Sequence, residues 1–223
     1  SDILMTGSDR IALSGGEWAS LCARAARGVG EAWGLSEDAG AALATLARWG
    51  VDATGAALAL FGREADRVLA APHPMDGQWT AGGLPALCPI RAGAFLSDLG
   101  AEAIGAEGVE MRGVAAPVLI LPFALNVARA AGGSVRVQWD GGAVLIGSDV
   151  GLQTLEGLCS VAQSDLRFDL VEDAFQHEPE GGAPVPMDAG HNAVLWDWAM
   201  KTMVPETDAL RASGAGAGRI DND

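Results

Sequence analysis

The sequence predicts an α+β protein in which an N-terminal helical layer packs on a small mixed or antiparallel sheet and a C-terminal helix closes the fold. Three observations support this class. Residues 14–70 repeat apolar side chains at helical spacing, residues 109–172 contain short runs of branched residues between turn signals, and residues 187–223 hold a further apolar helix and a glycine-rich tail. Because 223 residues suit one large domain, we expect these parts to form a single domain over residues 1–223.

The first helix has a complete start signal. Ser14 lies three residues before Glu17, which is the spacing of a capping box, and Leu13 is placed to pack against Trp18. Its apolar stripe is Trp18, Leu21, Cys22, Ala25 and Val29, so we expect Trp18 and Cys22 in the core. Glycines at 28 and 30 end the helix.

Two more helices follow. The second is predicted to start at Ser36, with two carboxylates in its first turn, and to stop at Gly50. The third is predicted over residues 53–70 after a cap at Asp52. Its expected buried side consists of Leu58, Phe61, Ala65 and Val68.

The rest of the chain alternates loops with strand-like runs. Residues 71–85 read as a long irregular loop, and a short helix is expected over residues 90–99. The predicted strands are VEMRGV, PVLILP, VRVQW, AVLI and LRFDLV, with a hairpin turn at residues 140–142 and a helix in PFALNVARAAGG. A last helix over residues 189–203 carries Val194, Leu195, Trp198 and Met203 on its apolar side.

Composition excludes several partners and compartments. Fourteen basic against 29 acidic residues give a formal charge of −15, which repels phosphate backbones and anionic lipid, so we expect neither a nucleic acid nor a membrane as partner. The longest apolar run, AAPVLILPFAL, is too short to span a bilayer, and the first ten residues resemble no secretory signal. Three cysteines without CxxC spacing indicate a reducing compartment, so a soluble cytoplasmic protein is expected.

Three segments carry a family resemblance. The run CARAARGVGEAWGLSEDAGAALATLARWGVD, the hairpin VRVQWDGGAVLI and the ending VPETDALRASGAGAGRIDND resemble a bacterial domain-of-unknown-function family, DUF 3726. The resemblance implies no activity, substrate or catalytic residue.

The first candidate site is the turn RGVGEAWGLSED. Its glycines allow a sharp bend that brings Arg27, Glu31, Trp33 and Glu37 together. Arg24 and Arg27 could hold an acid group of a small ligand, or they could pair internally with Glu31, Glu37 or Asp38, which we favour because carboxylates are abundant.

The second candidate site is the C-terminal tail. Its GAGAG run allows close backbone approach, and its carboxylates offer oxygen ligands. We expect it to fold back near the first turn, the alternative being a solvated end. The predicted ligand-binding residues at the two sites are Arg24, Arg27, Trp33, Glu37, Arg211, Asp221, Asn222 and Asp223.

No motif identifies a reaction, a cofactor or a metal. His73, His177 and His191 are scattered, and no GxSxG elbow occurs. Cys88 precedes an expected helix, whose N-terminus favours a reactive thiolate. We therefore predict no metal site and assign no catalytic residue.

Two function classes stay open. One is a small-metabolite enzyme or enzyme subunit with its site between the glycine-rich turn and the tail. The other is a non-catalytic binding or assembly protein. A small-molecule ligand and a homo-oligomer are the partners that stay open. A pocket lined by Arg27 and Trp33 favours the first, and a flat apolar patch favours the second.

Overall fold

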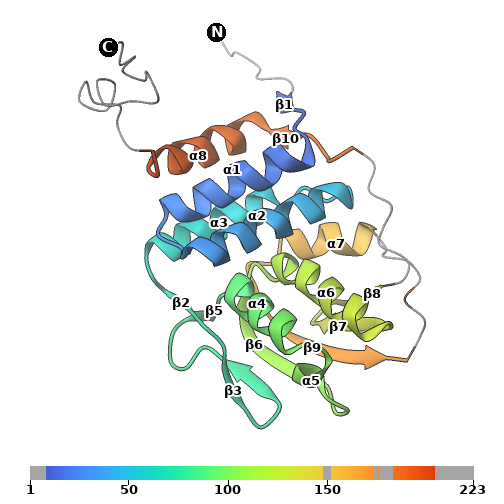
Figure 1. The fold of residues 1–223 in the computed structure, drawn as a ribbon. Coiled ribbons are helices and arrows are strands. Elements are labelled where there is room, and N and C mark those ends of the chain that lie inside the picture. The colour runs from blue at the N-terminus through green and yellow to red at the C-terminus, as the bar shows by residue number, and fades with distance from the viewer. Residues whose placement is uncertain (1–8, 148–151, 173–174, 176–182, 204–223) are drawn as a thin grey trace, which may run out of the picture.

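The computed structural model describes residues 9–147, 152–172, 175 and 183–203. It confirms the α+β class: a stack of helices fills one half of the molecule, and the main sheet with further helices beside it fills the other (Figure 1). Among the described residues, no helix is both long enough and apolar enough to cross a membrane.

Helix α1, Gly15–Gly28, begins with the predicted capping box. The Ser14 N–H donates to Glu17 Oε2 at 2.7 Å, and the Glu17 N–H donates to Ser14 Oγ at 3.3 Å. Trp18 is 0% exposed and Cys22 is buried beside it on the same face, as predicted. Leu13 is partly buried against the same core.

Helix α2, Trp33–Arg48, starts three residues earlier than predicted. Ser36 is not its cap, because the Ser36 hydroxyl lies inside the helix and donates to the Ala32 carbonyl at 2.7 Å. The first turn is instead held by the Trp33 indole, which donates to Glu37 Oε1 at 2.9 Å, one turn along. Such an exposed (i, i+4) pair stabilises a helix by only about 0.2–0.5 kcal/mol.

Helix α3, Thr54–Ala65, is shorter than the predicted segment. The chain turns at Arg67, whose φ is 56°, and then enters strand β2, Leu69–Ala70. Phe61 is buried as predicted, but Ala65 is exposed and Glu64 is buried in its place. The helix is therefore rotated so that a carboxylate faces the interior.

The segment predicted as an irregular loop contains a hairpin. Strands β3, His73–Met75, and β4, Gln78–Thr80, pair antiparallel around Asp76 and Gly77, which both have positive φ. An Asp-Gly pair is a strong hairpin signal, and the prediction overlooked it. Strand β5, Ala86–Leu87, helix α4, Pro89–Leu99, and the short helix α5, Ala101–Ile104, follow.

The PVLILP run is not a strand. It forms the 3₁₀ helix η1, Pro117–Ile120, which continues into helix α6, Leu121–Ala131. Pro122 lies in the first turn of α6, where its missing N–H costs nothing. In a short, fully apolar run, the spacing of apolar residues does not show whether the segment is a buried strand or a buried helix.

The predicted hairpin is confirmed. Strand β7, Ser134–Trp139, pairs antiparallel with β8, Gly142–Ile146, with Trp139 opposite Gly142. Strand β9, Gln163–Val171, lies between β7 and β6, Val109–Ala115, and is antiparallel to both. The main path of the mixed sheet is β2-β5-β6-β9-β7-β8. Helix α7, Leu152–Cys159, precedes β9.

Helix α8, Ala189–Met200, closes the fold against α1 (Figure 1). Its approach depends on Gly28, since a Cβ there would lie 1.8 Å from the Trp198 carbonyl oxygen. Leu195 is buried as predicted, but Val194 and Met203 are exposed. Before α8, strand β10, Met187–Asp188, pairs with β1, Arg10–Ile11.

The elements form layers. Helix α2 packs on α4, α6 and η1, and α6 in turn packs on β7 and β8. The N-terminal helices therefore reach the sheet mainly through this middle layer of helices (Figure 1). One consequence is that side chains of the α1–α2 turn meet the start of α4.

Candidate functional site

A groove of about 440 Å³ lies between α1 and α2. The two helices approach closely at Gly40, where a Cβ would lie 2.3 Å from the Ala19 carbonyl oxygen. Small residues line most of the groove, and charged or aromatic side chains line the rest. The lining residues are Gly16, Ala19, Ser20, Ala23, Arg24, Arg27, Trp33, Ser36, Glu37 and Ala41.

The four predicted ligand-binding residues of the helical part all line this groove. The Arg27 guanidinium lies over the Trp33 ring, 4.3 Å from its centroid, and Trp33 is 64% exposed. Glu37 accepts the indole N–H of Trp33. Arg24 lies 4.8 Å from the centroid of Trp196, which comes from α8. Stacking holds each guanidinium in place while leaving donor groups available to a ligand.

The favoured internal pairing of the arginines is not found. Within the part of the chain that the structure describes, neither Arg24 nor Arg27 forms a salt bridge with a carboxylate. Glu31, one of the expected partners, turns inward instead and binds Arg91. The groove therefore carries two arginines without carboxylate partners among the described residues, in a chain with a formal charge of −15.

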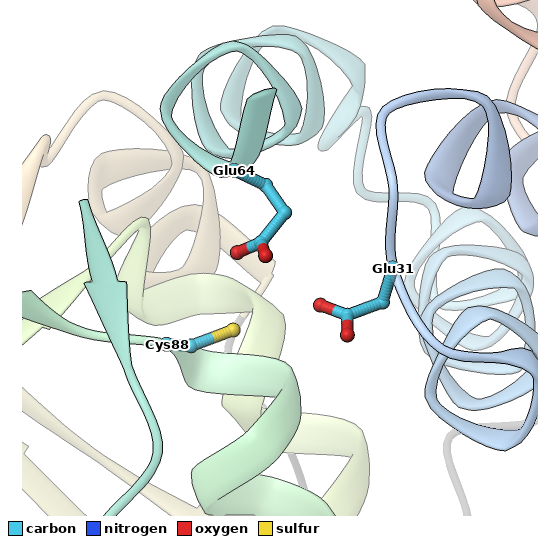
Figure 2. Close-up of side chains that lie close together, drawn as sticks. All are labelled: Glu31, Glu64 and Cys88. Carbon is cyan, nitrogen blue, oxygen red and sulfur yellow. The ribbon is translucent and has the colours of Figure 1, made fainter. Parts of the chain in front are cut away.

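Beneath this turn lies a buried group that we call the Glu31–Glu64–Cys88 cluster (Figure 2). Glu31 comes from the α1–α2 turn, Glu64 from α3 and Cys88 from the residue before α4. One potential ligand atom from each residue lies within 4.8 Å of the other two. Figure 2 shows the three side chains pointing toward one another.

Arg91 ties the two carboxylates together. Its Nη2 donates to Glu31 Oε2 at 3.1 Å. The same nitrogen also donates to Glu64 Oε1. Its Nη1 donates to the Leu69 carbonyl at 2.9 Å, which fixes the guanidinium against β2. The second oxygen of Glu64, Oε2, is buried without a hydrogen-bond partner.

Burial dominates the electrostatics of the cluster. It raises the pKa of Glu64, and the nearby Glu31 charge adds to this effect, while Arg91 opposes it. Burial also raises the pKa of the Cys88 thiol to about 11. The prediction of a reactive Cys88 at a helix start is therefore wrong for this state of the protein, because the loss of solvation outweighs the helix N-terminus.

This cluster does not follow from the sequence pattern, which places two of its residues elsewhere. Glu31 was expected to pair with the arginines of α1, and Ala65 was expected on the buried side in place of Glu64. A signal was present: Ala57, Phe61 and Glu64 share one helical stripe, so a carboxylate lies on an apolar face.

The other predicted site residues all lie in the tail, outside the described residues, and the described histidines lie apart from the groove. His73 is exposed on β3, and His191 contacts Thr54. Of the tail residues, Arg211, Asp221, Asn222 and Asp223 lie outside the described residues, as does His177. The expectation that the tail folds back toward the groove stays a prediction.

Residues 13–79 match the model of a family described as "Protein of unknown function (DUF3726)". The match confirms the predicted family resemblance over these residues, which include the groove, Glu31 and Glu64. Cys88 and Arg91 lie beyond it. Neither the curated proteins nor the solved structures provide a match to the chain.

Proposed function

We propose that the protein binds a small anionic metabolite in the groove between α1 and α2. In this proposal Arg24 and Arg27 hold an acid group, and Trp33 packs against the flat or apolar part of the molecule. The volume of about 440 Å³ is within the usual range for small-molecule sites.

One observation carries the proposal. Two arginines on the same groove are oriented by aromatic rings and lack carboxylate partners among the described residues. Arginine without a carboxylate partner is well suited to carboxylate and phosphate groups, which it binds through two parallel hydrogen bonds. Two such arginines that line one groove give it local positive charge, which supports selection of an anion.

The groove supports binding more directly than it supports a reaction. Its lining contributes two arginines, one tryptophan and one glutamate whose carboxylate already accepts the indole N–H. These groups orient a ligand, and none of them is held against a second group in a nucleophile–base arrangement. The proposal therefore concerns ligand binding, either in an enzyme or in a binding protein.

A thermal-shift screen with small carboxylates and phosphates tests the proposal, because a ligand of the native state raises the melting temperature. Loss of one charge-assisted hydrogen bond costs about 1.5–3 kcal/mol, so Arg27→Gln is expected to weaken binding by about tenfold or more. Arg136→Gln is the matched control, because this exposed arginine lies on β7, outside the groove. Equal binding by Arg27→Gln, Arg24→Gln and the parent protein contradicts the proposal.

The alternative is self-assembly, and one feature favours it. Trp196, Met200 and Met203 follow one another at helical spacing along α8 and just beyond it, and all three are exposed. A second copy of the chain would cover this stripe. The test is the molar mass in solution by light scattering: a dimer that Met200→Ser converts to a monomer supports assembly, and a monomeric parent protein excludes it.

A further inference from the structure

The geometry of the Glu31–Glu64–Cys88 cluster suits a small cation. A four-coordinate divalent ion with bonds of about 2.0–2.3 Å holds its ligand atoms roughly 3.3–3.8 Å apart. The three candidate ligand atoms already lie within 4.8 Å of one another, and all three residues are buried. Small rotamer adjustments therefore bring them to bonding distance around one point.

A second observation points into the same space. Glu64 Oε2 has no hydrogen-bond partner, although the Glu64 side chain is only 10% exposed. An unpartnered buried carboxylate oxygen is costly, so such an atom calls for an occupant that it can bind. A cavity of about 10 Å³, lined partly by Glu31, Glu64 and Cys88, lies at this position. That is close to the smallest space that holds a single water molecule or ion.

The charges match a divalent ion. Arg91 brings one positive charge to two carboxylates, which leaves the cluster short of positive charge inside the protein. A divalent ion bound to both carboxylates and to a Cys88 thiolate makes the whole group neutral. Arg91 uses Oε1 of Glu64 and leaves Oε2 free, whereas both Glu31 oxygens accept from Arg91 Nη2, at 3.3 and 3.1 Å. A metal ion would therefore share one Glu31 oxygen with Arg91, since a carboxylate oxygen has two lone pairs. Arg91 would then hold the carboxylates in place as a hydrogen-bond partner outside the metal's own ligands.

We propose that Glu31, Glu64 and Cys88 form a binding site for one divalent transition-metal ion of the zinc class, with Arg91 orienting the carboxylates. A thiolate ligand favours Zn²⁺ or Co²⁺ over Mg²⁺ and Ca²⁺, which prefer oxygen ligands alone. Binding breaks the S–H bond of Cys88 and forms a metal–sulfur bond, and the proton goes to solvent. This site is separate from the proposed anion groove, although the two share the α1–α2 turn.

The test uses the full chain, stripped with a chelator and titrated with Co²⁺ and then with Zn²⁺. One equivalent of Co²⁺ is expected to produce a thiolate-to-cobalt charge-transfer band, and Zn²⁺ is expected to displace it. Calorimetry of Zn²⁺ binding in two buffers of different ionisation enthalpy is expected to show release of at least one proton. Mg²⁺ at the same concentration is expected to have no effect.

Two variants test the ligands, and a third is the control. Cys88→Ser is expected to abolish the band, and Glu64→Gln, which retains the shape of the side chain, is expected to weaken Zn²⁺ binding about tenfold or more. Cys159→Ser is the control, because Cys159 is a partly buried free thiol outside the cluster. Circular dichroism checks that each variant folds. The proposal is overturned if Co²⁺ gives no band, if the band survives in Cys88→Ser, or if folded Glu64→Gln binds Zn²⁺ as tightly as the parent protein.

Discussion

Thr54 Oγ1 lies 2.7 Å from His191 Nδ1, and this contact joins the first residue of α3 to α8. The same hydroxyl lies 2.5 Å from Asp52 Oδ1, and Thr54 is 0% exposed. A hydroxyl has one proton, and a carboxylate only accepts, so Thr54 donates to Asp52 and accepts from the Nδ1–H of His191. The contact therefore places a proton on His191 Nδ1 and orders three residues from two distant segments.

Removal of this hydroxyl tests its contribution. Thr54→Val is expected to reduce the free energy of unfolding by about 1–3 kcal/mol, because it leaves His191 Nδ1 without its partner and removes one of the two Thr54 donors to Asp52 Oδ1. Thr54→Ser keeps the hydroxyl and is expected to lose less. Urea denaturation measures both, and a Val variant as stable as the parent protein contradicts the role given to the contact.

Trp18 gives a second test of the core. Trp18→Ala is expected to cost about 3–5 kcal/mol, because the side chain is completely buried. Trp18→Phe is expected to cost clearly less, since it keeps an aromatic ring and removes an indole N–H that has no partner. A loss below about 1 kcal/mol for Trp18→Ala in a urea titration contradicts this prediction. It shows that neighbouring side chains fill the cavity left by the indole.

Two helical glycines provide a matched pair. Gly40→Ala is expected to destabilise the protein, because its Cβ would meet the backbone of α1 2.3 Å away and push α2 from it. Gly62→Ala on α3 is expected to stabilise by about 0.5–1 kcal/mol, because nothing lies within 4 Å of the added Cβ. Melting temperatures that shift in the same direction in both variants contradict this assignment.

The contacts of Asp165 predict that the stability of the protein falls slightly at acidic pH. Its hydrogen bond from Arg112 and the N–H of Gly113 lower the pKa of its carboxyl below the ordinary 3.8. A lowered pKa in the folded state gives stability that is present above pH 3.8 and is lost as pH falls through the folded-state value. Both side chains are about half exposed, so the contribution is at most about 1 kcal/mol. Asp165→Asn is expected to be less stable than the parent protein at pH 6, with the gap closing toward pH 2 in urea titrations.

The tail prediction is tested by deletion of residues 214–223. Asp221 and Asp223 are candidate partners for Arg24 and Arg27, whose guanidiniums lack carboxylate partners among the described residues. If docking of the tail adds about 1 kcal/mol to the free energy of unfolding, deletion is expected to lower the melting temperature by about 2–4 °C. An unchanged melting temperature, with native proteolysis at Arg219 in the intact chain, shows that the tail is a solvated end.

Local sequence signals determined much of the fold. The capping box of α1 and the β7–β8 hairpin form as predicted, because a capping box and a two-residue turn depend on residues only a few positions apart. The same locality brought Arg24, Arg27, Trp33 and Glu37 to one groove, since they occupy the end of one helix and the start of the next.

Tertiary structure decided what local signals left ambiguous. The PVLILP run became helical because it is buried between other helices, where an apolar run carries no period. Glu31 turned inward because Arg91, sixty residues later, supplies a partly buried positive charge that the local arginines do not. The meeting of Glu31, Glu64 and Cys88 depends on the packing of α2, α3 and α4, and no spacing in the sequence encodes it, since the ligand atoms come from three separate elements.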